Sequence, residues 1–183
     1  DILPRITKEF PKLELQLFED ITDSLIESLH KNSIDVALLA FPYDTPDLKQ
    51  HIMFEERFFA AMPESGDTKG GKINIKDLQP EKLLLLEDGH CMRDHALSAC
   101  DLQIPKQRKP FSATSLPTII QMVRAGYGMT LLPEMACKPE TIPDGITLMR
   151  FMDKKPPTRQ IGLCWRAGDG RADDYETLAK SLS

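Results

Sequence analysis

Residues 83–100 read LLLLEDGHCMRDHALSAC, and this stretch predicts a strand, a turn and a helix in direct succession. The four leucines are typical of a buried strand, and Glu87-Asp88-Gly89 supplies a turn at its C-terminal end. Residues 92–99 then contain good helix formers and no helix breaker. A strand that leads into a helix is the repeating unit of α/β domains, so we expect an α/β fold.

Cys91 lies at the expected junction of strand and helix, where a thiol is easily activated. The N-terminal end of a helix and nearby cations lower the pKa of a cysteine. Arg93 is always charged and His90 can be, so Cys91 has the local features of a reactive thiol. Cys100 follows nine residues later, at the far end of an apolar-leaning segment. This asymmetry indicates an attacking cysteine and a resolving cysteine.

The spacing of the two cysteines predicts a conformational switch. If residues 91–100 form one helix, nine steps of rise separate the two Cα atoms by about 13.5 Å. A disulfide requires a Cα separation of roughly 4.4–6.8 Å. The bridge therefore forms only if the segment unwinds, and oxidation changes its conformation. The alternative is that both cysteines are small buried apolar residues, which is the usual environment of cysteine.

The segment 81–100, EKLLLLEDGHCMRDHALSAC, closely resembles the redox centre of the OxyR family, hydrogen-peroxide-sensing transcription activators of the LysR type. The motif GHCxRD at 89–94, with a second cysteine nine residues after the first, is specific to that family. The resemblance continues through ATSL at 113–116 and through VRAGYGMTLLP at 123–133, which is typical of LysR-type effector domains in general. It covers essentially the whole chain.

The resemblance implies an α/β fold of two Rossmann-like lobes, similar to the periplasmic binding proteins. Residues 1–55 and 159–183 are expected to form lobe I, and residues 56–158 lobe II with the redox cysteines. Ligands of such folds bind in the interlobe cleft, at the carboxyl ends of strands, which is where Cys91 is expected to lie.

Elsewhere, apolar runs alternate with helical patterns, which predicts mostly parallel sheets. Residues 35–41 are nearly all apolar and predict a buried strand. Residues 13–17 alternate with period two and predict a half-buried strand. Thr22 or Asp20 is expected to cap the helix that follows.

The first ten residues open almost directly in a helix, without the strand that an α/β unit would place before it. LysR-type regulators carry an N-terminal winged helix-turn-helix domain, a linker helix and then that strand. The resemblance therefore implies a regulatory domain without those parts. It also implies promoter DNA as a partner through the N-terminal domain, a homodimer or tetramer, contact with RNA polymerase, and glutaredoxin or thioredoxin as reductant.

The resemblance assigns peroxide chemistry to the cysteines. Hydrogen peroxide is the expected ligand, and the Cys91 thiolate attacks one of its oxygens to give a sulfenic acid and water. Cys100 then condenses with the sulfenic acid to form the disulfide. His90 is expected to orient the peroxide or to donate to the leaving hydroxide, and Thr22 to hydrogen-bond the peroxide.

Two charged residues complete the expected site. Arg93 would hold the thiolate, and Asp94 would fix Arg93 or His95. For His90 and His95 the alternative is that each is solvated or satisfied within the core.

Composition and charge narrow the classes of protein. With 183 residues, 41% of them hydrophobic, the chain can bury the core of one domain or of two small lobes. The net charge of −5 argues against a nucleic-acid-binding surface. No apolar run is long enough for a membrane span and no signal peptide is visible. The four cysteines are too few for a disulfide scaffold, which favours a reducing cytoplasm; Cys137 and Cys164 are expected to be structural.

Three other functions are compatible with these residues. A thiol peroxidase would use the same cysteines but turn over many times, whereas a sensor reacts nearly stoichiometrically, so we expect no enzyme. A zinc site of His90, Cys91, His95 and Cys100 has suitable ligand types but no standard spacing, so we expect no metal and no cofactor. A LysR-type domain that binds a small organic ligand fits the fold but leaves the cysteine pair without a role.

Overall fold

The structure is a computed structural model that describes residues 2–64, 71–87, 91–103 and 112–183; of Ile2, Cys91 and Ser112 it describes the backbone. The helices are α1 (Ile2–Glu9), α2 (Thr22–His30), α3 (Cys91–Ala99), α4 (Leu116–Arg124) and α5 (Ala172–Leu182), with short 3-10 helices at Ile75–Asp77, Pro80–Lys82 and Glu134–Ala136. The strands are β1 (Ala37–Phe41), β2 (Leu48–Pro63), β3 (Lys72–Ile73), β4 (Leu85–Leu86), β5 (Ser112–Ala113), β6 (Thr130–Pro133), β7 (Ile146–Phe151) and β8 (Thr158–Arg166).

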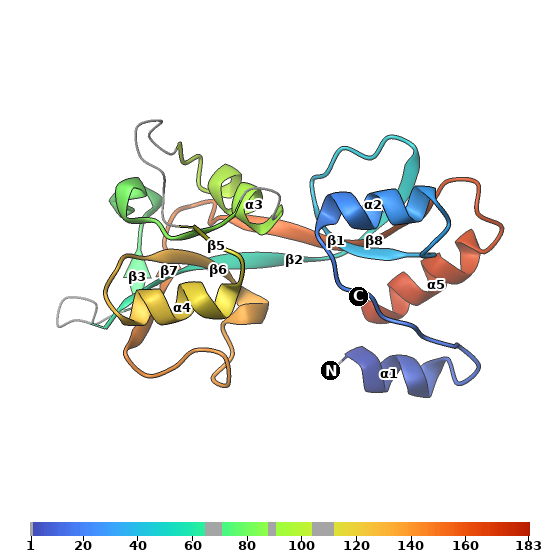
Figure 1. The fold of residues 1–183 in the computed structure, drawn as a ribbon, viewed down its shortest axis with the longest axis horizontal. Coiled ribbons are helices and arrows are strands. Elements are labelled where there is room, and N and C mark those ends of the chain that lie inside the picture. Colours follow the sequence, from blue (N-terminus) through green and yellow to red (C-terminus); the bar gives the residue numbers. More distant parts are fainter. Residues whose placement is uncertain (1, 65–70, 88–90, 104–111) are drawn as a thin grey trace.

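Strand β2 is sixteen residues long and organises the molecule, because it runs through two groups of elements (Figure 1). Its first part pairs with β8, which in turn pairs with β1. Its second part pairs with β6 and β7. We call the first group, with α2 and α5, lobe I, and the second group, with α3 and α4, lobe II. The two lobes confirm the expected fold class, while the lobe boundaries at residues 55–56 and 158–159 stay a prediction.

The prediction of mostly parallel sheets is wrong for the described part of the chain. All three partners of β2 run antiparallel to it, and β1 runs antiparallel to β8. Among the described strand pairs, only the short pairs β3–β7 and β4–β5 are parallel, together with the isolated bridge between Leu83 and Met129. The physical reason is that one strand serves both lobes, so the segments that return to it run in the opposite direction.

The strand predicted at residues 13–17 is also wrong. Residues 13–20 form no regular element, and Leu13, Leu15 and Leu17 are exposed, with 66% exposure for Leu17. A strand is stable only when its backbone groups pair with a neighbour. The described ladders provide none for this segment, so the period-two pattern alone did not determine its conformation.

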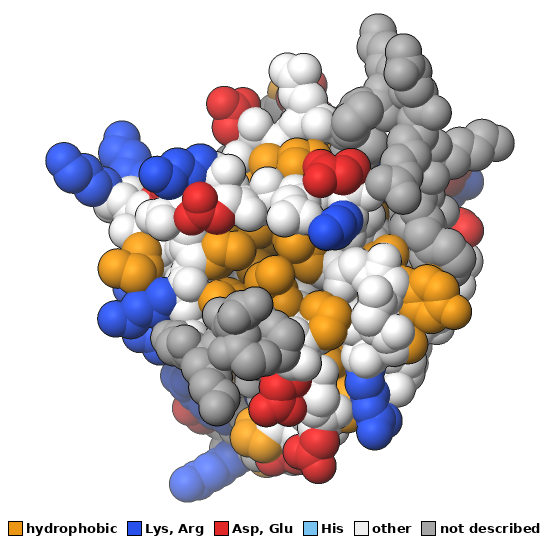
Figure 2. Space-filling view, turned by 90° about the vertical axis from the view of Figure 1, so that its left-hand side faces the viewer, with side chains coloured by type: hydrophobic (Ala, Val, Ile, Leu, Met, Phe, Trp, Pro, Cys, Tyr) orange, Lys and Arg blue, Asp and Glu red, His pale blue; other side chains and the backbone are white. Residues whose placement is uncertain are grey.

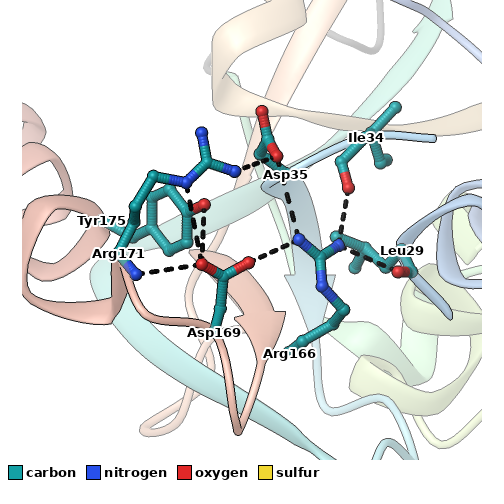
Figure 3. Close-up of polar contacts among 7 residues, drawn as sticks. All are labelled: Leu29, Ile34, Asp35, Arg166, Asp169, Arg171 and Tyr175. Carbon is teal, nitrogen blue, oxygen red and sulfur yellow. Dashed lines mark hydrogen bonds and ion pairs between the residues drawn. The ribbon is translucent and has the colours of Figure 1, made fainter. Parts of the chain in front are cut away.

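Lobe I packs one helix on each face of the sheet. Leu29 of α2 packs with Leu39 and Phe41 on one side, and Tyr175 and Ala179 of α5 pack on the other. The lobe is closed at the end of β8 by the polar network of Figure 3, in which Arg166, Asp169, Arg171, Asp35 and Tyr175 connect the start of α5 to the loop before β1.

Arg166 is the central residue of this network. Its Nη1 donates hydrogen bonds to the carbonyl oxygens of Leu29 and Ile34 at 2.9 and 2.8 Å, and its Nη2 to Asp169 at 2.5 Å (Figure 3). The amide of Arg171 donates to the carboxylate of Asp169 and, with Arg166, lowers the pKa of that acid. The guanidinium therefore fixes the end of α2 against the last strand.

We expect Arg166→Met to lower the free energy of unfolding by about 2 kcal/mol, because two carbonyls lose a charged donor. Urea denaturation measures this change. The control is Lys180→Ala, which removes an exposed pair with Glu176 and should cost about 0.5 kcal/mol or less. Equal losses in the two variants would show that the network of Figure 3 contributes no more than a surface pair.

The outer face of lobe II carries charges of both signs. Hydrophobic side chains lie near the middle of this face, with acidic and basic side chains around them (Figure 2). The basic side chains gather mainly along the left edge of this view (Figure 2). Among the described helices, none is long and apolar enough to cross a membrane.

Candidate redox site

The strand and the helix predicted for residues 83–100 are present, whereas two of the three residues of the predicted turn, 88 and 89, lie outside the described residues. Leu83 and Leu84 are buried ahead of β4, which pairs in parallel with β5, and Leu83 bridges Met129 beside β6. The regular strand is shorter than the four leucines, since it contains only Leu85 and Leu86. Residues 88–90, which include His90, lie outside the described residues.

Helix α3 begins at Cys91 and ends at Ala99, so Cys100 follows directly after its last residue. An unbroken helix of this length places the Cα atoms of Cys91 and Cys100 about 13.5 Å apart. A disulfide between them needs roughly 4.4–6.8 Å. The helix predicted from the sequence is thus confirmed, and it holds the two cysteines too far apart to bond.

Cys100 is a free thiol in the core of lobe II, with 2% of its surface exposed. It packs with Ala96 of α3 and with Leu83 and Leu85 of the preceding strand. Burial, and then the negative charge of Asp153, raise the pKa of the Cys100 thiol to about 12. Cys100 is therefore a neutral thiol that neither solvent nor a reagent reaches while α3 stays folded.

The other described cysteines, Cys137 and Cys164, also have raised pKa values, although Cys137 is only half-buried. Burial is the main cause that raises the pKa of Cys137 and of Cys164 to about 12. The Cys137 thiol donates to the carbonyl oxygen of Pro133 at 3.4 Å, and Cys164 is fully buried in β8. Their surroundings agree with the structural roles predicted for them.

We expect that iodoacetamide at pH 8 labels only one of the four cysteines rapidly in the native reduced chain, and that this residue is Cys91. The other three hold their protons until the pH approaches 12, so they react as thiolates only near that pH or after unfolding. The unfolded chain loses these thiol protons from about pH 9 and the folded chain only near pH 12, so the free energy of unfolding falls as the pH rises from 9 to 12. Mass spectrometry of the labelled peptides measures the rates, and rapid labelling of Cys100 would contradict its burial.

Helix α3 contacts both lobes. Ala96 and Cys100, one turn apart, face the core of lobe II, and the helix also contacts β1 and β8 of lobe I. His95 makes a polar contact across the lobes, because its Nε2 lies 3.0 Å from the carbonyl oxygen of Pro42. Helix α3 is therefore held between the two lobes, where the fold was expected to place its ligand.

Thr22 approaches the same region through α2. It is the first residue of that helix and is buried, with 5% exposure. The next residue, Asp23, accepts a hydrogen bond from the hydroxyl of Tyr43, the neighbour of Pro42. The start of α2 and helix α3 thus contact adjacent residues of one loop, and both helices lie above the line of β2 and β8 in Figure 1. The predicted cap is wrong, because the N-cap is Ile21 and it makes no side-chain cap hydrogen bond.

The other expected site residues are only partly described. Arg93 is half-buried and Asp94 is exposed on α3, while the side chain of Cys91 lies outside the described residues. Their roles stay predictions. Within the described ranges, no three His, Cys, Asp or Glu side chains form a group that could hold a metal ion; two of the four residues weighed as zinc ligands, His90 and Cys91, lie outside that search.

A buried ion pair at the crossing between the lobes was missed by reasoning from the sequence. Glu56 is 2% exposed; its Oε2 accepts from the Nε of Arg159 at 2.7 Å, and its Oε1 accepts from the amide of Met135 at 2.7 Å. The Arg159 guanidinium also lies over the ring of Phe58, 5.7 Å from its centre. A glutamate in a strand usually faces solvent, so neither residue type nor spacing indicated this pair.

Comparisons with a family model and with known relatives point to one family of bacterial regulators. The family model described as the LysR substrate binding domain matches residues 1–182. The chain is 37% identical to the transcriptional dual regulator OxyR of Escherichia coli over 182 residues, which is 99% of this chain and 59% of that protein. It thus spans less than two thirds of the length of that relative.

Solved structures agree. The reduced form of OxyR superimposes with a TM-score of 0.87 at 35% identity, covering 99% of this chain and 85% of that one. A hydrogen-peroxide-bound cysteine-to-serine mutant of Corynebacterium glutamicum OxyR superimposes with a TM-score of 0.89 at 31% identity, covering 99% of this chain and 58% of that one. The chain therefore belongs to the LysR substrate-binding domain family, and OxyR regulatory domains are among its relatives of known structure.

Proposed function

We propose that this chain is the redox-sensing regulatory domain of a LysR-type transcription activator, switched by hydrogen peroxide through Cys91 and Cys100. One observation carries the proposal: helix α3 begins at Cys91, Cys100 follows directly after its last residue, and the Cys100 thiol is buried in the core of lobe II. Two cysteines in this arrangement can form a disulfide only when α3 unwinds. The likeness to OxyR, including a peroxide-bound relative, supplies the oxidant.

The chemistry uses one peroxide and two thiols. The Cys91 thiolate, favoured by the helix N-terminus, attacks one peroxide oxygen; the O–O bond breaks, hydroxide leaves and a sulfenic acid forms. The leaving hydroxide takes a proton and becomes water. Cys100 then attacks the Cys91 sulfur, and a second water leaves as the disulfide forms. The two sulfurs lose two electrons in total, and the peroxide is reduced to two waters.

The residues around Cys91 would assist the first step. His90 orients the peroxide or donates to the departing hydroxide, and Arg93 holds the thiolate. Asp94 fixes Arg93. Thr22 hydrogen-bonds the peroxide from the start of α2, which is supported by its burial and by the hydrogen bond of its neighbour Asp23 to the loop that α3 also contacts.

The second step, formation of the disulfide, changes the conformation of α3. To reach Cys91, Cys100 must leave a core that includes Leu83, Leu85 and Ala96, and α3 must unwind. Repacking at this position alters the surfaces through which such domains form dimers or tetramers, and so the spacing of the DNA-binding domains. We propose promoter DNA and RNA polymerase as partners of the whole protein, and glutaredoxin or thioredoxin as the dithiol that restores the thiols. A reducing cytoplasm suits the three free thiols of the described residues.

The test is to map the oxidised peptides after treatment of the reduced chain with hydrogen peroxide. We expect one disulfide, between Cys91 and Cys100, after about one equivalent of peroxide. A bridge that contains Cys137 or Cys164, or no bridge at all, would overturn the proposal. Peroxide consumption in excess dithiol distinguishes the alternative function. A sensor is reset slowly and consumes about one equivalent of peroxide before it is reduced again, whereas a thiol peroxidase consumes many equivalents in that time.

A further inference from the structure

His95 makes a contact that the peroxide chemistry above does not use. Its side chain is 9% exposed, and its Nε2 lies 3.0 Å from the carbonyl oxygen of Pro42, a residue 53 positions away in the other lobe. A carbonyl oxygen only accepts hydrogen bonds, so Nε2 carries the hydrogen and donates it. His95 thus joins α3 of lobe II to the loop that follows β1 of lobe I.

The acceptor is held in place by the rest of its loop. The hydroxyl of Tyr43 donates to the carboxylate of Asp23 near the start of α2, and Asp47 pairs with the Nε2 of His30 at the end of α2, at 2.6 Å. The loop is therefore tied to both ends of one lobe I helix. The carbonyl oxygen of Pro42 is therefore held in position to accept a hydrogen bond from α3.

The opposite side of α3 is fixed by lobe II. Ala96, the neighbour of His95, and Cys100, one turn further on, are both 2% exposed within the lobe II core. Unwinding α3 to bring Cys100 to Cys91 must withdraw Cys100 from that core. It must also break the bond between His95 and Pro42, since the backbone that aims His95 changes its path.

We propose that His95 is a positioning residue whose hydrogen bond to Pro42 holds α3 in its helical, reduced form and thereby sets the rate at which the Cys91 sulfenic acid is converted to the disulfide. This proposal rests on the proposed function, because the condensation step is the one that it governs. It assigns His95 no part in the attack on peroxide.

The test separates the two chemical steps. In His95→Ala, we expect the conversion of sulfenic acid to disulfide to be about three- to tenfold faster, as expected for loss of one buried hydrogen bond. The formation of sulfenic acid, followed with a dimedone probe in a Cys100→Ser background, should be unchanged. His95→Gln retains a donor at a comparable distance from the backbone and should restore the original rate. The matched control is His51→Ala, on β2 and half-buried, with no change in either step.

Amide hydrogen exchange of the reduced chain tests the same bond without peroxide. We expect α3 amides to exchange faster in His95→Ala than in the unsubstituted chain, and His95→Gln to be protected again. Should His95→Ala fail to fold by circular dichroism, His95→Asn, whose amide is too short to reach Pro42, replaces it.

An unchanged condensation rate together with unchanged exchange overturns the proposal, as does equal acceleration in the Ala and Gln variants. If the unsubstituted chain forms no disulfide while His95→Ala still loosens α3, the proposed function fails and the anchoring role of His95 stands.

Discussion

Cys91→Ser, treated with one equivalent of hydrogen peroxide, gives neither sulfenic acid nor disulfide, and its rate of peroxide consumption falls to that of the three buried or half-buried thiols. The reason is that those thiols keep their protons up to a pH of about 12, so none of them supplies a thiolate at neutral pH. Cys100→Ser behaves differently: it reacts with peroxide at the original rate and then accumulates sulfenic acid, because the resolving thiol is gone. Dimedone labelling followed by mass spectrometry distinguishes the two variants.

The controls are the two remaining cysteines. Cys137→Ser and Cys164→Ala should each form the Cys91–Cys100 bridge at the original rate, since neither residue neighbours α3 in the described cores. Accumulation of sulfenic acid at Cys100 instead of Cys91 would show that Cys100 attacks the peroxide, and would contradict the roles assigned to the two cysteines.

Arg159→Met should lower the free energy of unfolding by about 3–5 kcal/mol, because it leaves the carboxylate of Glu56 buried without its cation. Glu56 is 2% exposed, so water cannot replace the lost partner. Urea denaturation with a fitted midpoint and slope measures the loss. The double variant Glu56→Gln with Arg159→Met should recover much of it, since an amide needs no counter-ion.

The matched control for this pair is Lys31→Ala, which removes an exposed ion pair with Glu27 and should cost about 0.5 kcal/mol or less. If Arg159→Met costs no more than this control, the ion pair at the crossing between the lobes does not stabilise the fold.

Much of the redox segment could be predicted from the sequence, because its signals are local. Four consecutive leucines, a turn and a run of helix formers determine a buried strand and a helix within a few residues. The buried strand predicted at residues 35–41 is present as β1 and follows from a similar local pattern. The motif around Cys91 then identified the family, which the comparisons confirm.

The errors and omissions concern long-range pairing. Residues 13–17 have the right alternation for a strand but pair with no described neighbour, and the direction of each ladder depends on which segments return to β2. Glu56 and Arg159 lie 103 positions apart, so nothing near either residue predicts its partner. Likewise, no local signal joins His95 to Pro42.

The length of β2 limits how the two halves of this molecule can move. Glu56 and Arg57 pair with Arg159 and Thr158 in the same ladder that continues into lobe I. A hinge closure of the lobes about that point would stretch consecutive backbone hydrogen bonds between β2 and β8. The two lobes therefore resist rotation relative to each other. Under the proposed switch, a change at α3 would therefore be passed on through the surface around that helix and not by one lobe pivoting on the other.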